Sequence, residues 1–319
     1  MRILVSGGAG FIGSHLCQRL LDEGYQVICV DNLSTGSIEN IKPFFVNKNF
    51  IFINYDVNYP LKELPKIDAI FHLASPASPN EESCISYHRL ALETISVNTI
   101  GTLELLKLAK KNKAEFLFAS SSEVYGDPTV HPQKETYFGN VNPIGPRAVY
   151  DEAKRLGETL VSHFWRKEGV NGRIARIFNT YGPRLRIEDK RMIVNFIVAS
   201  LTNKPITIYG EGEQTRSLCY IDDLIEGLLR FMFYPKTENQ VINLGSDEEH
   251  PVLFYAQKIK KLTSSKSKIV FSQKLSEGDP VRRRPDISKA KKILKWKPTT
   301  TLDEGLKKVI AYYKEVLKI

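Results

Sequence analysis

The sequence predicts an α/β protein, with a doubly wound parallel sheet followed by a smaller C-terminal α/β lobe. Short apolar runs alternate with helical patterns through the first half, as a parallel sheet requires. After residue 178 the pattern loosens into loops and shorter elements. The chain has 319 residues, 42% of them hydrophobic, and is long enough for two compact units with cores. We expect one unit over residues 1–178 and a second over 179–319, with some later helices packing back on the first.

Each expected element follows from a local pattern. Apolar runs predict the strands Arg2–Ser6, Gln26–Asp31, Phe50–Tyr55, Ala69–Leu73, Glu115–Ser120 and Arg173–Phe178. Helical patterns predict the helices Ile12–Glu23, Thr94–Lys111 and Val149–Glu168. In the second half we expect a strand at Ile206–Tyr209 and helices near Asp222–Phe233 and Leu302–Leu317. Strands separated by helices imply right-handed crossovers, and therefore a doubly wound sheet.

The composition argues against several classes of protein. Disorder, collagen and a disulfide scaffold do not fit 42% hydrophobic residues, 25% charged residues and four cysteines. The cysteines are scattered, with no Cys-x-x-Cys pair and no histidine at zinc spacing, so we expect no metal and a reducing compartment. No apolar run reaches roughly 18 residues, and Met1–Val5 lead straight into a glycine loop. The sequence therefore predicts a soluble, cytoplasmic protein without a membrane partner.

The chain carries a formal net charge of +9, most of it near the C-terminus. From Lys274 to Ile319 there are 13 Lys and Arg against 6 Asp and Glu. A basic protein can bind nucleic acid, anionic lipid or a small anionic substrate. One hypothesis is therefore a nucleotide-sensing or RNA-binding protein, although the sequence has no recognised RNA-reading motif. We expect a small anionic substrate and no nucleic acid.

A glycine-rich loop directly follows the first strand and opens the first helix. Gly7, Gly10 and Gly13 allow backbone N–H groups and the helix N-terminus to approach a pyrophosphate. Asp31 ends the second strand 18 residues after Gly13, near the spacing expected for a carboxylate on the adenosine ribose. A carboxylate there repels a ribose phosphate, so the pattern predicts a Rossmann domain that binds NAD rather than NADP. The alternative is a structural glycine turn beside a solvated aspartate.

Further residues near this loop or at strand ends are candidate cofactor contacts. Asp56 and Val57 end the third strand and are expected to border the adenine. The remaining candidates are Phe11, Ile12, Asn32, Leu73, Ala74, Ser75, Asn98, Tyr150 and Lys154. For Asn98, a capping or turn role is an equally good interpretation.

Tyr150 and Lys154 stand four residues apart on an expected helix, and therefore share one face. A free tyrosine is a poor base at neutral pH, but an adjacent ammonium and a positive nicotinamide would lower its pKa. Such a tyrosine can remove a hydroxyl proton during hydride transfer. Ser121, at the end of the fifth strand, is placed to hold the same hydroxyl. Without this context, the pair would be interpreted as surface residues of a helix.

Several longer runs carry a resemblance to a known family. They are His72–Pro79, Ser121–Pro128, His131–Gln133, Val141–Ala148, Ala175–Arg184, Gln214–Ser217 and Arg284–Ile287. With the glycine loop and the Tyr–Lys pair, they resemble the extended short-chain dehydrogenase/reductases that modify nucleotide sugars, over nearly the whole chain. Within this NAD-dependent epimerase/dehydratase group, the likeness is greatest to the UDP-glucuronate decarboxylases, also called UDP-xylose synthases.

The resemblance implies NAD-dependent decarboxylation of UDP-glucuronate to UDP-xylose through a UDP-4-keto intermediate. Oxidation at C4 places a ketone β to the C6 carboxylate, and such an acid loses carbon dioxide readily because the remaining electron pair delocalises into the carbonyl. In this scheme Tyr150 matches the base, Lys154 its activator and Ser121 the hydroxyl holder. Ser122 and Glu123 stand where a dehydratase carries an Asp–Glu pair, and Ser in place of Asp argues against water elimination.

The resemblance also assigns substrate contacts. Glu123 and Arg283 match residues around the uronate carboxylate, with Arg283 as its positive partner. Without the resemblance, Arg282–Arg284 would be interpreted as a solvated charge run. The other expected substrate contacts are Tyr87, Asn179, Arg184, Tyr209 and Arg216. A homodimer through the helices Thr94–Lys111 and Val149–Glu168 is implied as well.

The chain departs from the family pattern after Pro79. The segment Asn80–Ser86 is longer than expected, and Ala91 stands where a proline is usual. This segment follows the fourth strand on the cleft side, where it can change the shape of the sugar pocket. The sequence therefore does not fix which sugar is the substrate. The alternative is an NAD-dependent C4 epimerase or 4-dehydrogenase acting on another nucleotide hexose or heptose.

Overall fold

A seven-stranded parallel sheet forms the centre of the molecule in the computed structural model, which describes residues 1–272 and 279–319. The strand order is β11-β6-β5-β4-β1-β2-β3, with the Rossmann reversal between β1 and β4. The strands are β1 (Arg2–Ser6), β2 (Gln26–Asp31), β3 (Phe50–Asn54), β4 (Ala69–His72), β5 (Glu115–Ser121), β6 (Gly172–Ile177) and β11 (Gln240–Leu244). The predicted fold class is confirmed.

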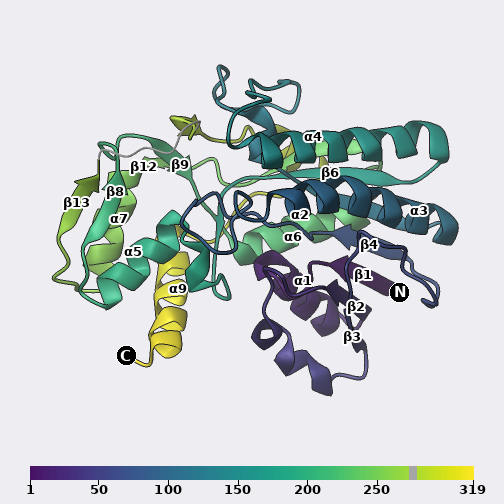
Figure 1. Cartoon of the computed structure of the whole chain (residues 1–319), viewed down its shortest axis with the longest axis horizontal. Coiled ribbons are helices and arrows are strands. Elements are labelled where there is room, and N and C mark those ends of the chain that lie inside the picture. The colour runs from purple at the N-terminus through teal and green to yellow at the C-terminus, as the bar shows by residue number, and fades with distance from the viewer. Residues whose placement is uncertain (273–278) are drawn as a thin grey trace.

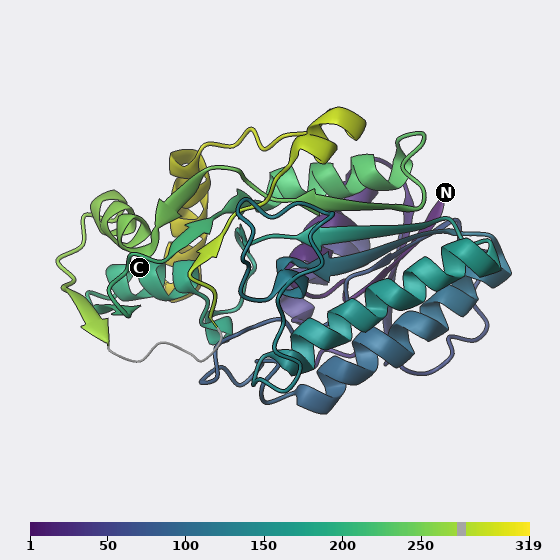
Figure 2. The same ribbon diagram turned by 90° about the horizontal axis from the view of Figure 1, so that it is seen from above.

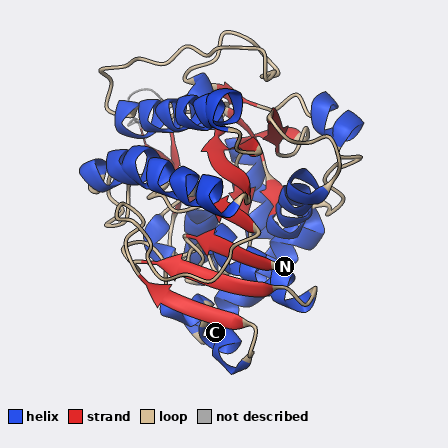
Figure 3. Cartoon of the chain, turned by 90° about the vertical axis from the view of Figure 1, so that its right-hand side faces the viewer, coloured by secondary structure: helices blue, strands red, loops and turns tan. Residues whose placement is uncertain are grey.

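Helices cover both faces of this sheet (Figures 1 and 3). Successive side chains of a strand point to opposite faces, so Ile3 and Val5 join one apolar cluster and Leu4 joins the other. The first cluster includes α1 (Phe11–Asp22) and α6 (Ile221–Phe233). The second includes α3 (Thr102–Asn112) and α4 (Ala148–His163), which lie side by side in Figure 2. The sheet is therefore buried on both faces, as its near-continuous apolar strands require.

Two helices differ from the sequence expectation. The one expected from Thr94 begins earlier, as α2 (Ala91–Ser96), and a π-helical turn at Val97–Gly101 separates α2 from α3. Ala91, where the family has a proline, is thus the first helical residue. The helix expected to end at Glu168 ends its α-helical part at His163, and Phe164–Glu168 forms a second π-helical turn.

The second unit lies at the left of Figure 1 and is built from small sheets and helices. Its sheets pair β7 (Thr180–Tyr181) with β10 (Cys219–Tyr220), β8 (Ile206–Tyr209) with β13 (Ile269–Ser272), and β9 (Thr215–Ser217) with both β12 (Glu249–Pro251) and β14 (Arg282–Arg283). Its helices are α5 (Met192–Leu201), α7 (Val252–Leu262) and α9 (Leu302–Leu317). Residues of α5, α7 and α9 belong to the apolar cluster that contains Ile3, so one continuous core joins the two units.

The chain returns to the central sheet after residue 178. β11 pairs with β6 in parallel, and α8 (Ser288–Ile293) packs against β11. The sheet thus takes its last strand from the second half of the sequence. Within residues 1–272 and 279–319, no helix has the length and apolar character needed to cross a membrane.

Candidate active site

Close backbone contacts fix the loop between β1 and α1. Gly7 has a φ of +73°, and a Cβ at this residue would lie 2.6 Å from the amide nitrogen of Ala74. A Cβ on Gly13 would lie 2.1 Å from the carbonyl oxygen of Gly7. Neither position has room for a side chain, so the backbone remains open at the N-terminus of α1. This arrangement fits a pyrophosphate held by backbone N–H groups.

Asp31 fixes the other side of the loop. Its carboxylate accepts hydrogen bonds from the backbone N–H groups of Ala9 (2.9 Å) and Leu33 (2.8 Å). Burial raises the pKa of Asp31, while these two hydrogen bonds act in the opposite direction. The aspartate is therefore a structural part of the loop as well as the candidate ribose ligand, a double role that the sequence did not indicate.

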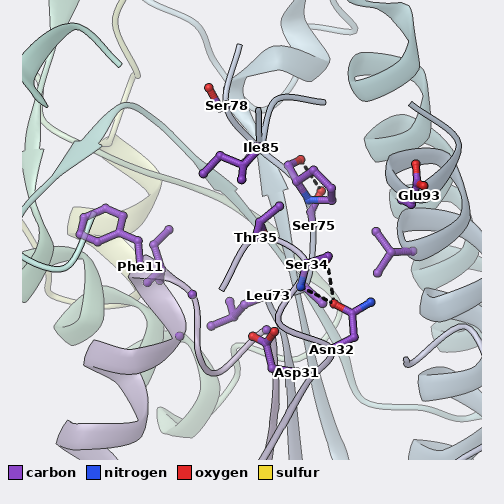
Figure 4. A pocket seen from close by; sticks show the side chains of 18 of the residues that line it. Phe11, Asp31, Asn32, Ser34, Thr35, Leu73, Ser75, Ser78, Ile85 and Glu93 are labelled. Atoms are coloured by element: carbon purple, nitrogen blue, oxygen red, sulfur yellow. Dashed lines mark hydrogen bonds between the residues drawn. The ribbon is translucent and has the colours of Figure 1, made fainter. Parts of the chain in front are cut away.

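A pocket opens between this loop and the carboxyl ends of the strands (Figure 4). In Figure 4, Phe11 approaches from α1, Asp31 and Asn32 from the end of β2, and Leu73 and Ser75 from beyond β4. The expected cofactor contacts that line the pocket are Gly7, Gly10, Phe11, Ile12, Gly13, Asp31, Asn32, Asp56, Val57, Leu73, Ala74 and Ser75. The residues present fit a dinucleotide.

Asn98 lies in the π-helical turn behind this pocket and is fully buried. Its Nδ2 donates to Ser75 Oγ (2.9 Å) and to the carbonyl oxygen of Thr94 (2.8 Å). Its Oδ1 has no hydrogen-bond partner within the described part of the chain. Asn98 thus positions Ser75, and it is not among the residues that line the pocket.

The pocket also contains residues that the sequence analysis missed. Ser34 and Thr35 directly follow the expected contacts Asp31 and Asn32, so their proximity was a usable signal. Ile85 belongs to the segment Asn80–Ser86, which was already expected on the cleft side. Further missed residues come from distant segments without a local signal and include Asn40, Glu93, Arg186, Asp189 and Arg191. Arg184, expected at the substrate, lines this same pocket, and its Nη1 donates to the carbonyl oxygen of Ser14 in α1 (3.2 Å). The structure therefore places Arg184 beside the glycine loop.

Tyr150 and Lys154 lie on the buried face of α4. Lys154 Nζ donates to the carbonyl oxygen of Ala119 in β5 (2.7 Å) and lies 5.6 Å from the centre of the Tyr150 ring. Ser121, at the end of β5, lies close enough to Tyr150 to act on its pKa. The structure thus brings together the three residues that the sequence placed in one catalytic group.

The pKa of Tyr150 differs from the lowered value that the sequence predicts. Burial raises the pKa of Tyr150 to about 12, although Ser121 acts in the opposite direction. Burial also lowers the pKa of Lys154 to about 7, with Glu158 opposing the shift. In the chain alone, desolvation therefore outweighs the expected lowering of the tyrosine pKa by the lysine.

Glu123 forms the centre of a buried ion-pair cluster at the start of the 3-10 helix Ser122–Tyr125. Arg283 Nη1 donates to its Oε1 (2.5 Å) and Arg283 Nη2 to its Oε2 (3.1 Å). Arg147 Nη2 also donates to Oε2 (2.5 Å). Burial raises the pKa of Glu123, but the two guanidiniums outweigh burial and hold the pKa well below its usual range. Glu123 is therefore ionised.

A second acid extends this cluster. Asp279 accepts a hydrogen bond from Arg216 Nη2 (2.9 Å) and lies 3.6 Å from Arg147 Nη1. Arg216 and Arg283 are register partners on the adjacent strands β9 and β14. Arg147 and Asp279 were missed, although Arg147 stands three residues before Tyr150 within a run that carried the resemblance. We call these five residues, Glu123, Arg147, Arg216, Asp279 and Arg283, the arginine cluster.

Tyr87 and Asp151 connect the arginine cluster to the catalytic group. The ring of Tyr87 stacks on that of Tyr150 with 4.9 Å between centres, and Arg147 lies 6.0 Å from the centre of the Tyr87 ring. Asp151 follows Tyr150 on α4 and is buried. The Tyr87 hydroxyl and Asp151 Oδ1 are both buried without a hydrogen-bond partner among the described residues. Two polar atoms are thus available to a ligand next to Tyr150.

The remaining expected residues lie around this centre. Ser122 is buried as the first residue of the 3-10 helix. Asn179 lies between β6 and β7, and Tyr209 ends β8 in the second unit with 39% of its surface exposed. No side-chain hydrogen bond joins either of these two residues to the arginine cluster within the described ranges. Their substrate roles stay predictions.

The longer segment after Pro79 packs against the second unit. Ser78 Oγ donates to the carbonyl oxygen of Asp189 (2.6 Å), Ser83 Oγ to that of Glu188 (2.5 Å) and Asn80 Nδ2 to that of Lys190 (3.3 Å). Ile85 points into the pocket of the glycine loop (Figure 4). The segment therefore joins the two units at the pocket, which agrees with its expected place on the cleft side.

Comparison with known proteins agrees with this geometry. A model of the NAD dependent epimerase/dehydratase family matches residues 3–245. The chain belongs to this family. The NAD dependent epimerase/dehydratase family includes the cofactor in its description, and the prediction of NAD as the cofactor is confirmed. Among the described residues, no group of three or more His, Cys, Asp or Glu could hold a metal ion.

Similar members of the NAD dependent epimerase/dehydratase family include curated decarboxylases. The chain is 48% identical over 317 residues to UDP-glucuronic acid decarboxylase 1 of Danio rerio, covering 99% of this chain and 73% of that protein. It is 47% identical over 307 residues to UDP-glucuronic acid decarboxylase 3 of Arabidopsis thaliana, covering 96% and 87%.

Solved structures of family members share the fold over the whole chain. UDP-glucuronic acid 4-epimerase from Bacillus cereus, in complex with UDP-glucuronic acid and NAD, is 32% identical with a TM-score of 0.87, covering 99% of this chain and 100% of that chain. UDP-glucose 4-epimerase from Thermotoga maritima, with UDP-glucose, is 32% identical with a TM-score of 0.88 and the same coverage.

Proposed function

We propose that the protein is an NAD-dependent UDP-glucuronate decarboxylase, which converts UDP-glucuronate to UDP-xylose and carbon dioxide. The observation that carries this proposal is the arginine cluster beside the Tyr150–Lys154 pair, in which every residue except Asp279 is buried. Three guanidiniums face two carboxylates there, which leaves one positive charge for one further carboxylate. A uronate supplies that carboxylate, and a neutral hexose does not. The 46–48% identity to curated UDP-glucuronic acid decarboxylases over nearly the whole chain supports the same assignment.

The residues around the sugar then divide the chemistry between them. Bound NAD would supply the hydride chemistry at C4 of the sugar, and the residues of this chain supply the rest. Tyr150 removes the proton of the C4 hydroxyl, and Ser121 holds that hydroxyl through its side chain. Lys154, fixed by the carbonyl oxygen of Ala119, orients and activates the tyrosine. Arg283 and Arg147 hold the C6 carboxylate next to the ketone formed at C4.

Ser122 separates this reaction from water elimination. A dehydratase needs a proton-transfer pair at the end of β5, and Ser122 supplies no carboxyl group there. Its neighbour Glu123 has both oxygens bound by guanidiniums and remains ionised. Ser122 and Glu123 therefore maintain the charge and the shape of the site, and they do not transfer protons to a leaving hydroxyl group.

A second candidate is C4 epimerisation of the same substrate. It is favoured by the similarity to the Bacillus cereus structure, whose protein is a UDP-glucuronic acid 4-epimerase. To test the proposal, the purified protein is incubated with UDP-glucuronate and NAD, and the nucleotide products are identified by mass spectrometry. We expect UDP-pentose and one carbon dioxide for each substrate consumed. A UDP-hexuronate product of unchanged mass and inverted configuration at C4 would contradict the decarboxylase proposal and support the epimerase.

We also propose a homodimer formed through the α2, α3 and α4 face. Leu92 (75% exposed), Ile95, Ile100 and Leu156 are large apolar residues exposed on this face. Burying them against a second copy would remove them from water. Light scattering should show a dimer for the native chain and a monomer for a Leu92→Asp, Leu156→Asp double variant. A monomeric native chain would contradict the proposal.

We further propose that the protein acts in the cytoplasm. All four cysteines are free, and Cys17, Cys29 and Cys219 are buried as reduced thiols, which suits a reducing compartment. Cell fractionation with an antibody to the chain tests this location, and recovery in an oxidising compartment would contradict it.

A further inference from the structure

The proposed reaction, on which this inference rests, consumes one proton. Breaking the C5–C6 bond releases carbon dioxide and leaves an electron pair on C5, delocalised into the C4 carbonyl. The product carries hydrogen at C5, so a proton must be added there. The proton that Tyr150 removes from the C4 hydroxyl returns to that oxygen when C4 is reduced again, and it is not available for C5. A second proton donor is therefore required.

Glu123 does not meet this requirement. Its Oε1 and Oε2 both accept hydrogen bonds from Arg283, and Oε2 accepts another from Arg147. A carboxyl group surrounded in this way stays ionised and carries no proton to give. Asp279 forms an ion pair with Arg216 (2.9 Å) and lies 3.6 Å from Arg147.

Asp151 has the opposite environment. It lies immediately after Tyr150 on α4, it is buried, and its Oδ1 has no hydrogen-bond partner in the described part of the chain. No guanidinium lies within ion-pair distance of its carboxyl group among those residues. A buried carboxyl group without a partner is more stable with its proton on.

The charged groups around Asp151 agree with this conclusion. Burial raises the pKa of Asp151 to about 8, and Glu123 adds to the shift, while Arg147 and Arg283 act in the opposite direction. Glu152, its neighbour on α4, makes a further small contribution that also raises the pKa. The Tyr87 hydroxyl is also buried without a hydrogen-bond partner in the described part of the chain, and burial raises the pKa of Tyr87, with Glu123 and Asp151 adding to the shift.

We propose that Asp151 donates the proton that C5 receives after carbon dioxide has left. In this step the O–H bond of the Asp151 carboxyl group breaks and a C–H bond forms at C5. The electron pair of that bond comes from the enolate, and the C4 carbonyl is restored. Asp151 is left as a carboxylate and regains a proton from solvent before the next turnover, which accounts for the proton that the reaction consumes.

The test follows carbon dioxide, NADH and UDP-xylose separately in the Asp151→Asn variant. We expect carbon dioxide release in the first turnover to continue, NADH to persist, and UDP-xylose formation to fall about 100-fold, a typical contribution of a general acid. Glu152→Gln is the matched control on the same helix, since Glu152 is half exposed and pairs with Arg155. It should behave like the native enzyme. Asp151→Glu, which keeps the carboxyl group, should restore part of the lost rate.

The pH dependence gives a second readout. UDP-xylose formation by the native enzyme and by Glu152→Gln should fall as pH rises through about 8, because Asp151 loses its proton. In Asp151→Asn this decline should be absent. Native-like UDP-xylose formation with an unchanged pH profile in Asp151→Asn would overturn the proposal, as would loss of carbon dioxide release in step with UDP-xylose. Failure of the native enzyme to release carbon dioxide would instead overturn the proposed function.

Discussion

The glycine loop and the arginine cluster, which we propose as the sites for NAD and for the uronate carboxylate, are built by different physical means. The loop offers backbone N–H groups in a space that Gly7 and Gly13 keep free of side chains, and its geometry comes from consecutive residues. The arginine cluster offers ionised side chains, and the contact between Glu123 and Arg283 joins residues 160 positions apart. The first site thus depends on shape and the second on charge balance. Substitutions should distinguish the two sites. Added side-chain volume should damage only the glycine loop, and altered charge should damage only the arginine cluster.

The largest effect is expected at Tyr150, beside the arginine cluster. Tyr150→Phe removes the base that takes the C4 proton while leaving the ring that stacks on Tyr87. We expect kcat for carbon dioxide release to fall about 1,000-fold, or about 4 kcal/mol in barrier height. NAD affinity, measured by fluorescence titration, should change little.

Tyr125→Phe is the control for this variant. Tyr125 is also buried, but its hydroxyl donates to Asn243 (2.8 Å), outside both regions. Its loss should lower stability and leave kcat within about threefold, since a buried hydrogen bond contributes about 1 kcal/mol to folding. Equal losses of kcat in the two variants would mean that Tyr150 has only a structural role.

Glu123→Gln tests the charge balance of the arginine cluster. It leaves three guanidiniums against one carboxylate in a buried site, and should lower the free energy of unfolding by about 3 kcal/mol. The control is Glu115→Gln, which breaks the partly exposed pair with Arg173 (2.6 Å) at the opposite end of β5. Denaturant unfolding should show the larger loss for Glu123→Gln, and turnover should fall only in that variant. An unchanged turnover of Glu123→Gln would mean that Glu123 does not belong to the active site.

Gly13→Ala tests the shape of the loop. The new methyl group would meet the carbonyl oxygen of Gly7 at 2.1 Å, so the backbone must move, at a cost of about 2 kcal/mol. We expect NAD affinity to fall about 30-fold. Gly10→Ala, whose methyl group would meet the same oxygen at 3.1 Å, should weaken binding much less. Equal affinities in the two variants, measured by calorimetry, would contradict the steric account.

The smallest effect concerns stability. The folded-state pKa of Asp151, about 8, lies above its ordinary value of 3.8, so the folded chain binds this proton more tightly than the unfolded chain. The stabilisation is present below about pH 4 and is lost as pH rises towards 8. Asp151→Asn removes this dependence, so its free energy of unfolding should equal that of the native chain near pH 4 and increasingly exceed it as pH rises towards 8. A difference in the free energy of unfolding between Asp151→Asn and the native chain that stays constant from pH 4 to pH 8 would contradict a raised pKa of Asp151.

The contrast between the two regions also explains what the sequence could and could not predict. Gly7, Gly13 and Asp31 follow from strand, loop and helix patterns within one short stretch, because backbone geometry is a local property. Tyr150, Lys154 and Ser121 were found by helical spacing and by their place at a strand end. The boundaries of β1, β2, β8 and α9 were predicted as observed for the same reason.

The missed features depend on contacts between distant segments. β11 completes the sheet from the second half of the chain, where α5 and α7 also went unpredicted. Asp279 meets Arg216 and Arg147 only after the second unit has packed on the first. The high pKa of Tyr150 was missed because burial is a tertiary property. Arg184 was expected at the substrate, and only the fold shows that it lies beside the glycine loop.

The central claim is that the arginine cluster is completed by the carboxylate of the substrate. Calorimetric binding of UDP-glucuronate and UDP-glucose to the NAD-loaded enzyme tests this claim directly, because the two ligands differ in that carboxylate. We predict that UDP-glucuronate binds at least about 10-fold more tightly, and that Arg283→Met abolishes the difference. Equal affinities for the two sugars in the native enzyme would contradict the account.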